Sequence, residues 1–195
     1  MRVRGLGDGP RDEAMMPGIL ETLLKVKLSV EFTAWRQLRF SGGYAAKLRF
    51  VMLQARDAGD DGVVAWADED THGKNSLRDL RAAREQDNRK HLPVPTASGF
   101  AVPHAEAWLL DDPVAIRDVL QVDAGAIPTV RNSASPKTAL DELHRNSPRA
   151  EEALMRLLPH LAAALEPARC QHGHETGWDG FQKDVHQQFG ERGNG

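Results

Sequence analysis

The sequence contains a single cysteine, Cys170, among its 195 residues. One cysteine excludes an internal disulfide framework and fits a reducing cytoplasm. No apolar run approaches the roughly 20 residues that a membrane-spanning helix needs. The first residues, Met1-Arg-Val-Arg-Gly, are too polar for a signal peptide. We therefore expect a soluble, cytoplasmic protein.

The sequence also lacks a marked excess of either charge. Lys and Arg number 25 and Asp and Glu number 28, which gives a formal net charge of −3. A surface that binds nucleic acid would therefore have to be a local patch of positive charge. The Gly-x-x-x-x-Gly-Lys-Ser/Thr motif is also missing, so the chain carries no P-loop ATPase of its own.

The apolar run at residues 63–67 predicts a strand that is buried on both faces, because it lies uninterrupted between two clusters of turn-forming residues. Further strands are predicted at residues 3–6, 30–38 and 100–102, the second of them nearer an edge. A loop is expected at residues 93–100, and helices are expected at residues 15–28, 44–58 and 76–90. Strands that alternate with helices indicate an α/β fold with a mostly parallel sheet flanked by helices.

The last third of the chain is predicted to be helical. Two short helices at residues 106–110 and 114–120 precede it, and helices at residues 137–145, 149–165 and 178–185 follow. Pro159 should kink or split the second of these three. We therefore expect an α/β domain at residues 1–122, a helical C-terminal extension at residues 123–189 and a disordered tail at residues 190–195.

Two carboxylates follow the central strand at a spacing of two residues. Alternation along an extended chain points Asp68 and Asp70 the same way, with Glu69 opposite. In open α/β sheets, ligands bind just beyond the carboxyl ends of the strands. The two carboxylates repel each other unless a cation lies between them, and hard oxygen ligands suit Mg²⁺ or Mn²⁺. The alternative is that they cap the next helix or solvate the turn.

A second acidic turn follows the first strand. It contains Asp8, Asp12 and Glu13, which are candidates either for the same site or for capping the next helix. Further along, Glu106 lies close to Trp108, and a buried carboxylate there would be costly unless it were paired or bound to a metal.

Three other features favour ordinary structural roles. The segment Cys170-Gln-His172-Gly-His174 lacks the paired spacing of structural zinc sites. His104 is expected to make a structural hydrogen bond from a loop. Three arginines spaced three residues apart lie near one face of the helix predicted at residues 76–90; they are Arg78, Arg81 and Arg84. This face is expected to be solvated, and the less favoured alternative is a strip that contacts phosphates.

Together, the acidic motifs resemble those of Toprim-type domains. Such domains carry an acidic residue in a Gly-containing turn after the first strand and Asp-x-Asp after a later strand. The matching segments here are Asp8-Gly-Pro-Arg-Asp-Glu13 and Asp68-Glu-Asp70. The chain is similar in particular to small Toprim-like proteins related to the OLD-family (overcoming lysogenization defect) nucleases of phage defence, in which a stretch like Glu106-Ala-Trp-Leu-Leu-Asp-Asp112 recurs. The resemblance covers residues 3 to 115. One departure is Asp8, where the family has glutamate, so either Asp8 or Glu13 fills that role.

The resemblance implies a site at the carboxyl edge of the sheet that binds one or two Mg²⁺ (or Mn²⁺) ions. Its metal ligands would be Asp8, Glu13, Asp68 and Asp70, with Glu106 completing the cluster. The implied catalytic residues are Glu13, Asp68, Asp70 and Lys74, where Lys74 is the first choice for the positive group among candidates that include His72, His104 and Lys137. The implied activity is metal-dependent hydrolysis of DNA or RNA, with nucleic acid as substrate and an ATPase or a second copy of the chain as candidate partners.

Two alternatives stay open at this point. The fold could serve as a non-catalytic binding or regulatory subunit of a larger complex, with the acids acting as caps; the net charge of −3 and the aspartate in the first motif favour this. A weaker alternative is a phosphoryl-transfer enzyme that acts on a nucleotide or a small phosphoester.

Overall fold

A four-stranded, all-parallel sheet forms the centre of the protein, with the strand order β2-β1-β3-β4. The computed structural model describes residues 1–39, 43–69, 76–88, 94–132 and 135–190. The strands are β1 (Arg2–Gly7), β2 (Ser29–Ala34), β3 (Gly62–Asp68) and β4 (Thr96–Ala101). The predicted α/β class with a parallel sheet is thus confirmed, and the strand predicted nearer an edge, β2, is an edge strand.

The central strand β3 is buried along all seven of its residues. Val63 and Ala65 belong to the hydrophobic core on one face of the sheet, and Val64 and Trp66 belong to the core on the other face. This alternation follows from the two-residue period of a strand. The predicted burial on both faces is therefore confirmed.

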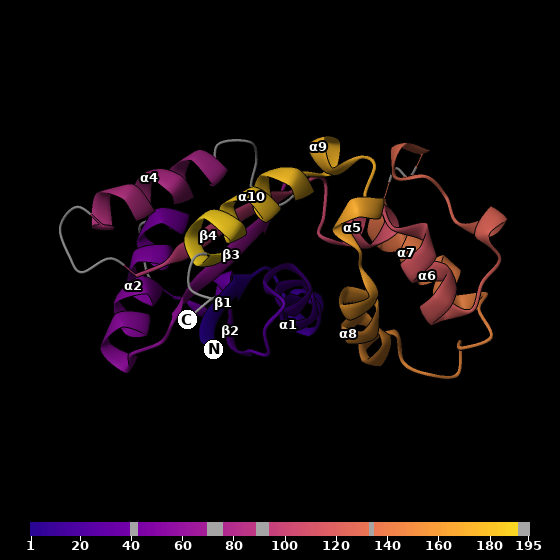
Figure 1. Cartoon of the computed structure of the whole chain (residues 1–195), viewed down its shortest axis with the longest axis horizontal. Helices are drawn as coiled ribbons and strands as arrows, with labels where there is room; N and C mark the ends of the chain where they lie inside the picture. The colour runs from indigo at the N-terminus through magenta and orange to yellow at the C-terminus, as the bar shows by residue number, and fades with distance from the viewer. Residues whose placement is uncertain (40–42, 70–75, 89–93, 133–134, 191–195) are drawn as a thin grey trace.

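Helices cover both faces of the sheet (Figure 1). On one face lie α2 (Gly43–Ala58) and α4 (Ser76–Asn88), and on the other lie α1 (Pro10–Leu24) and α10 (Trp178–Phe189). Helix α8 packs along α1. The remaining helices are α5 (Glu106–Leu110), α6 (Pro113–Leu120), α7 (Pro136–Arg145), α8 (Leu154–Ala164) and α9 (Gly173–Thr176), and the 3₁₀ turns are η1 (Trp35–Gln37), η2 (Ala124–Ala126), η3 (Val130–Asn132) and η4 (Pro167–Arg169).

The C-terminal helices share their hydrophobic core with the sheet. Phe181 of α10 stacks on Trp108 with ring centroids 5.0 Å apart, and Trp66 of β3 meets the same indole edge-on at 5.3 Å. Gly99 leaves room for this packing, since a Cβ atom there would lie 2.6 Å from the Phe181 ring. The segment predicted as an extension therefore supplies part of the core against which β3 and β4 fold.

Strand β4 begins at Thr96, so the loop predicted at residues 93–100 is wrong over most of its length. The segment reads as a loop because it contains Pro, Thr, Ser and Gly. Ser98 is nevertheless fully buried, because its N–H donates to Asp184 Oδ2 of α10 at 2.7 Å and its hydroxyl donates to the same oxygen at 3.3 Å. A distant carboxylate thus stabilises a polar residue inside the sheet.

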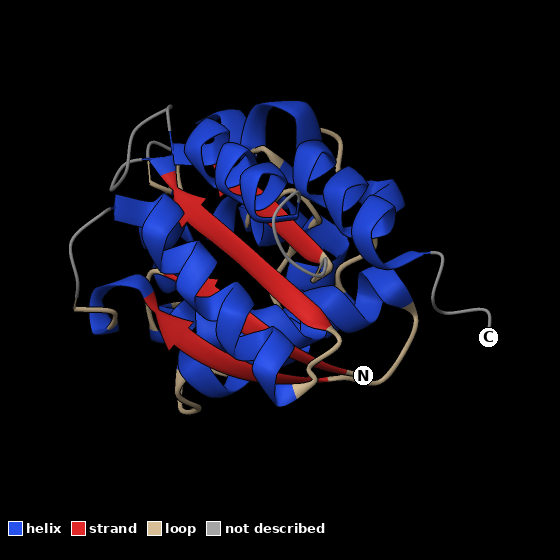
Figure 2. Ribbon diagram, turned by 90° about the vertical axis from the view of Figure 1, so that its left-hand side faces the viewer, coloured by secondary structure: helices blue, strands red, loops and turns tan. Residues whose placement is uncertain are grey.

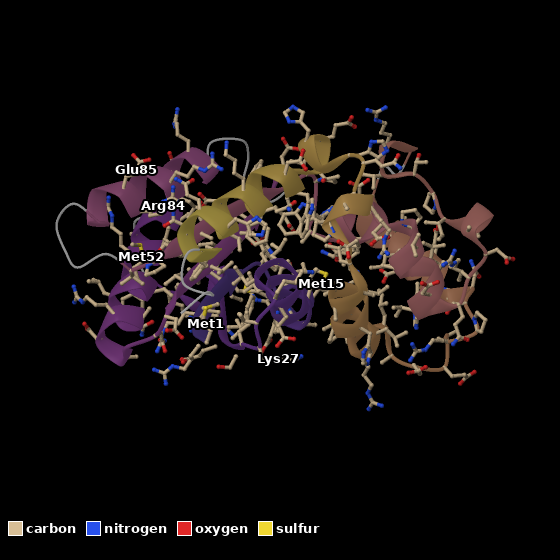
Figure 3. All side chains as sticks on the ribbon, in the orientation of Figure 1. Met1, Met15, Lys27, Met52, Arg84 and Glu85 are labelled. Carbon is tan, nitrogen blue, oxygen red and sulfur yellow. The ribbon has the colours of Figure 1, made fainter. Side chains whose placement is uncertain are left out.

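Arg84 of α4 is the other partner of Asp184, at 2.7 Å between Nη1 and Oδ2. Figure 3 shows Arg84 on the side of α4 that faces α10 and Glu85 on its outer side. Arg84 is therefore neither solvated nor free to contact phosphate, in contrast to the shared arginine face predicted from the sequence. Arg78 on the same helix is exposed.

Two further details of the helices differ from the predictions. Helix α1 begins at Pro10, because proline is favoured at the first helical position, and it ends at Leu24 rather than at Leu28. Helix α8 runs through Pro159 as one helix, so the predicted split does not occur. None of the helices within the described residues is both long enough and apolar enough to cross a membrane. The predicted tail beyond Gly190 lies outside the described residues.

Helices α1 and α8 approach each other closely at Gly18. A Cβ atom at Gly18 would lie 2.8 Å from Ala162 Cβ and 2.9 Å from the Ala163 backbone nitrogen. We expect Gly18→Ala to lower the free energy of unfolding by about 1–3 kcal/mol, because the clash outweighs the better helix propensity of alanine. Gly180 of α10 has open space around it, so Gly180→Ala should be neutral or stabilising by up to about 1 kcal/mol. Urea unfolding of both variants tests the pair, and equal effects would contradict the close contact.

Candidate functional site

The carboxyl ends of β1 and β3 bring two aspartates together, because these strands are parallel neighbours (Figure 2). Asp8 follows β1 and Asp68 ends β3. The N–H of Asp68 donates to Asp8 Oδ2 at 3.0 Å. In turn, Asp68 Oδ1 accepts a hydrogen bond from the N–H of Ala105 at 3.2 Å, which ties it to the segment after β4. The predicted convergence of these two aspartates at one edge of the sheet is present.

Asp12 lies in the first turn of α1 and is 4% exposed. Its Oδ2 accepts hydrogen bonds from the N–H groups of Asp8 at 2.5 Å and Gly9 at 3.3 Å. Gly7 makes room for this carboxylate, since a Cβ atom there would lie 2.8 Å from both Cβ and Oδ2 of Asp12. The capping role foreseen for this turn is thus performed by Asp12, with its carboxyl group held beside β1.

The expected convergence of Glu13 with the other carboxylates is not found. Glu13 is exposed and does not line the cavity described below, whereas Asp12 does. The physical reason is the helix start at Pro10, because each residue turns the side chain by about 100° and only one of two adjacent acids can face the sheet. Asp70 and Lys74, as well as His72, lie outside the described residues.

Glu106 is 2% exposed and is paired, as its burial requires. Arg11 Nη1 lies 3.1 Å from Glu106 Oε1, and Arg11 Nη2 lies 2.7 Å from Asp141 Oδ1 of α7. One guanidinium group therefore bridges carboxylates from α5 and α7 across the N-terminus of α1. The charge-assisted pair offsets the cost of burying Glu106.

These groups surround a cavity of about 520 Å³, a size typical of ligand sites. Its acidic lining consists of Asp8, Asp12, Asp68 and Glu106; its basic lining consists of Arg11, Arg36 and Lys137; and Gly9, Pro10 and Met155 complete it. Lys137 comes from α7 and Met155 from α8, so the predicted extension contributes to the site. His104 is not part of this lining.

Burial and mutual repulsion disturb the ionisation of the acidic lining. Burial, followed by the charges of Asp12, Asp8 and Glu106, raises the pKa of Asp68 to about 8. Burial likewise raises the pKa of Asp12 to about 6, although the nearby Trp66 indole and the Asp8 N–H favour its ionised form. Trp66 Nε1 makes no hydrogen bond of good geometry, so its influence on Asp12 is that of a nearby dipole. The cluster therefore holds protons that isolated carboxylates would have lost.

The donor set is made only of carboxylates, which suits Mg²⁺ or Mn²⁺. As positioned, no three acidic, histidine or cysteine side chains among the described residues surround a common point closely enough to hold an ion. The carboxylate lining of the cavity therefore fits a hard cation. To coordinate one, these side chains would have to move closer together. The same finding gives no support to a site at residues 170–174.

Sequence reasoning missed two basic residues that line the cavity, Arg11 and Arg36, and it named Asp12 as a candidate without placing it among the metal ligands. Arg11 lies in the first turn of α1, but no local pattern shows that its side chain pairs with carboxylates of α5 and α7. Arg36 has no local signal, since it lies in η1 after the edge strand and reaches the cavity only through the fold.

Comparison with protein-family models, with curated proteins and with solved structures gives no match in any of the three. The class of the protein therefore follows from its own fold and cavity. It is an α/β protein with a parallel sheet and an acidic cavity at the carboxyl edge of that sheet.

Proposed function

We propose that the acidic cavity binds a divalent cation and hydrolyses phosphodiester bonds, as a Toprim-type nuclease would. One observation carries the proposal: Asp12, Asp68 and Glu106 are each at most 5% exposed, and they line one cavity together with Asp8. Burying carboxylates and gathering them in this way are both unfavourable, and burial first and the neighbouring charges second raise the pKa of Asp68. A bound cation would relieve that cost, whereas helix capping alone does not require the cluster.

In this proposal Asp8, Asp12, Asp68 and Glu106 hold the cation, and Asp70 is a further candidate ligand. A divalent cation held by these carboxylates would supply Lewis-acid chemistry, polarising the phosphodiester and promoting attack by water. The residues of the chain provide the rest. The basic groups of the lining would stabilise the charge that develops on the phosphate. The substrate would be DNA or RNA, and a role in phage defence, a partner ATPase and a second copy of the chain stay predictions.

A second candidate function is a non-catalytic binding or regulatory subunit. A specific observation favours it, because Asp8, Asp12 and Asp68 each accept a backbone hydrogen bond and so stabilise the loops at this edge of the sheet. In that case the carboxylates hold the fold together and bind no cation.

A crystal soaked with Mn²⁺ separates the two functions. The nuclease proposal predicts an anomalous peak coordinated by Asp68 and at least one more of the four carboxylates, together with Mn²⁺-dependent cleavage of an oligonucleotide. DNA and RNA oligonucleotides and a mononucleotide should be assayed in parallel, since cleavage of the mononucleotide alone would identify a small-phosphoester enzyme instead. A cavity that stays without a peak at millimolar Mn²⁺ would leave the regulatory subunit as the better interpretation.

A further inference from the structure

We propose that helix α7 completes this site, with Lys137 as a residue that contacts a phosphate of the substrate and with the Arg11–Asp141 ion pair as the contact that positions α7. The inference rests on the proposed function and extends it. It assigns substrate binding to a helix that lies outside the segment with Toprim-like motifs.

Lys137 has no evident structural role. It is exposed, it lines the cavity, and its ammonium group forms no ion pair with any residue that the structure describes. It also lies in the first turn of α7, directly after Pro136. A cation is unfavourable there, because the helix macrodipole places partial positive charge at this end. The same dipole and the lysine together favour an anion in the cavity.

Asp141 fixes the position of this lysine. The two residues are four apart on α7 and therefore share a face of the helix. Asp141 Oδ1 accepts from Arg11 Nη2 at 2.7 Å, and Arg11 is held in turn by the buried Glu106. The ion pair thus joins α7 to the N-terminus of α1 at the wall of the cavity. Because Arg11 is engaged by two carboxylates, it acts as a positioning residue.

The charges of the cavity make the phosphate contact depend on the cation. Four acidic groups oppose three basic groups in the lining, so when the acids are ionised the cavity has no excess of positive charge to attract an anion. One divalent cation reverses this balance. Arg36, which is exposed on η1, then lines the cavity as a second basic group. A phosphate bound to the cation would then meet basic groups from two distant segments of the chain, Arg36 and Lys137.

Binding of a fluorescein-labelled single-stranded DNA 12-mer in Ca²⁺, followed by anisotropy over a range of salt concentrations, tests the role of Lys137. We expect Lys137→Ala to weaken binding about tenfold and to reduce the slope of log K against log salt by about 0.7, the value for one phosphate contact on a single strand. Lys137→Arg should restore both. Lys183→Ala is the matched control, because Lys183 is an exposed lysine of α10 that does not line the cavity, and it should change neither.

The direction in which Asp141→Asn changes the DNA affinity tests whether the Arg11–Asp141 ion pair positions α7. Removing a negative charge near the cavity should tighten DNA binding if charge alone matters. If the ion pair positions α7, the same substitution should weaken binding several-fold. Tighter binding would therefore overturn the positioning role.

Mn²⁺ binding measured by electron paramagnetic resonance distinguishes failure of this inference from failure of the proposed function. Lys137→Ala should bind Mn²⁺ as the wild type does. Unchanged DNA affinity and salt slope in Lys137→Ala, or no DNA binding by a wild type that binds Mn²⁺, would overturn the inference and leave the metal site intact. A wild type that binds no Mn²⁺ would overturn both.

Discussion

Asp68→Asn should stabilise the metal-free protein at pH 8 and abolish its stabilisation by Mn²⁺. In the folded protein the pKa of Asp68 is raised to about 8, whereas in the unfolded chain it is near 3.8. The stability associated with the protonated carboxyl is complete below about pH 4 and is lost as the pH rises toward 8. Asparagine cannot ionise, so the variant avoids this loss. Because each pKa unit corresponds to about 1.4 kcal/mol, we expect a gain of roughly 2–5 kcal/mol at pH 8.

Urea unfolding in EDTA at several pH values measures this effect. The difference between Asp68→Asn and the wild type should widen from pH 4 to pH 8 and stay constant above it. Asp118→Asn is the matched control, since Asp118 is an exposed carboxylate of α6 that lies outside the cavity; it should change stability by less than about 0.5 kcal/mol. A gain that does not depend on pH would contradict the raised pKa.

Mn²⁺ should reverse the order of stability of the wild type and Asp68→Asn. A site filled at about 100 times its dissociation constant stabilises the wild type by roughly 2.7 kcal/mol, and the effect should increase with pH because binding must displace the proton from Asp68. Asp68→Asn should show no such gain, whereas Asp118→Asn should show all of it. Equal stabilisation of the wild type and Asp68→Asn would exclude Asp68 as a ligand.

Asp184→Ala should destabilise the protein by about 3–5 kcal/mol, with a fall in Tm of roughly 6–20 °C. Asp184 accepts hydrogen bonds from Arg84 and from the N–H and hydroxyl groups of Ser98, and both charged side chains are nearly buried. Alanine would leave the guanidinium group unpaired and the Ser98 N–H unsatisfied inside the sheet. Thermal unfolding checks the size of this loss.

Two further variants show whether the loss arises from an uncompensated charge. The double variant Arg84→Met with Asp184→Leu removes both charges and should recover more than half of the stability. Asp118→Ala removes an exposed pair with Arg117 and should cost less than about 1 kcal/mol. A double variant as unstable as Asp184→Ala would show that the hydrogen bonds to Ser98 carry the effect.

The central strands and the order of helices could be predicted because their signals are local. The apolar run of β3 and the turn-forming residues around it are adjacent in the sequence. Strand β4 was misread at its start because Ser98 and Gly99 are unfavourable in an isolated strand. They are suitable only where Asp184 and Phe181, more than 80 residues away, supply a hydrogen-bond acceptor and an aromatic ring. The sequence pattern of a single segment cannot show that such distant partners will be present.

The site could be predicted in its location but not in all of its members. Asp68 could be placed at the carboxyl end of a buried strand from its own segment, whereas its grouping with Asp8 and Glu106 was implied by the resemblance to Toprim-type domains. Glu13 was preferred because the resembling family carries a glutamate in this motif, whereas the start of α1 at Pro10 turns Asp12 toward the sheet and Glu13 toward solvent. Arg36 and Asp141 carry no motif, and only the packing of the chain brings their elements to the cavity.

The packing of Trp66, Trp108 and Phe181 also affects the order in which the protein can fold during its synthesis on the ribosome. Chains emerge from their N-terminus at about 5–20 residues per second, and β3 is complete long before Phe181 of α10 is made. Until then, Trp66 of β3 and Trp108 of α5 lack the Phe181 ring that packs against both of them. Lys137 and Met155 also arrive after the acidic residues of the cavity. The cavity described here is therefore complete only after α7 and α8 have been made.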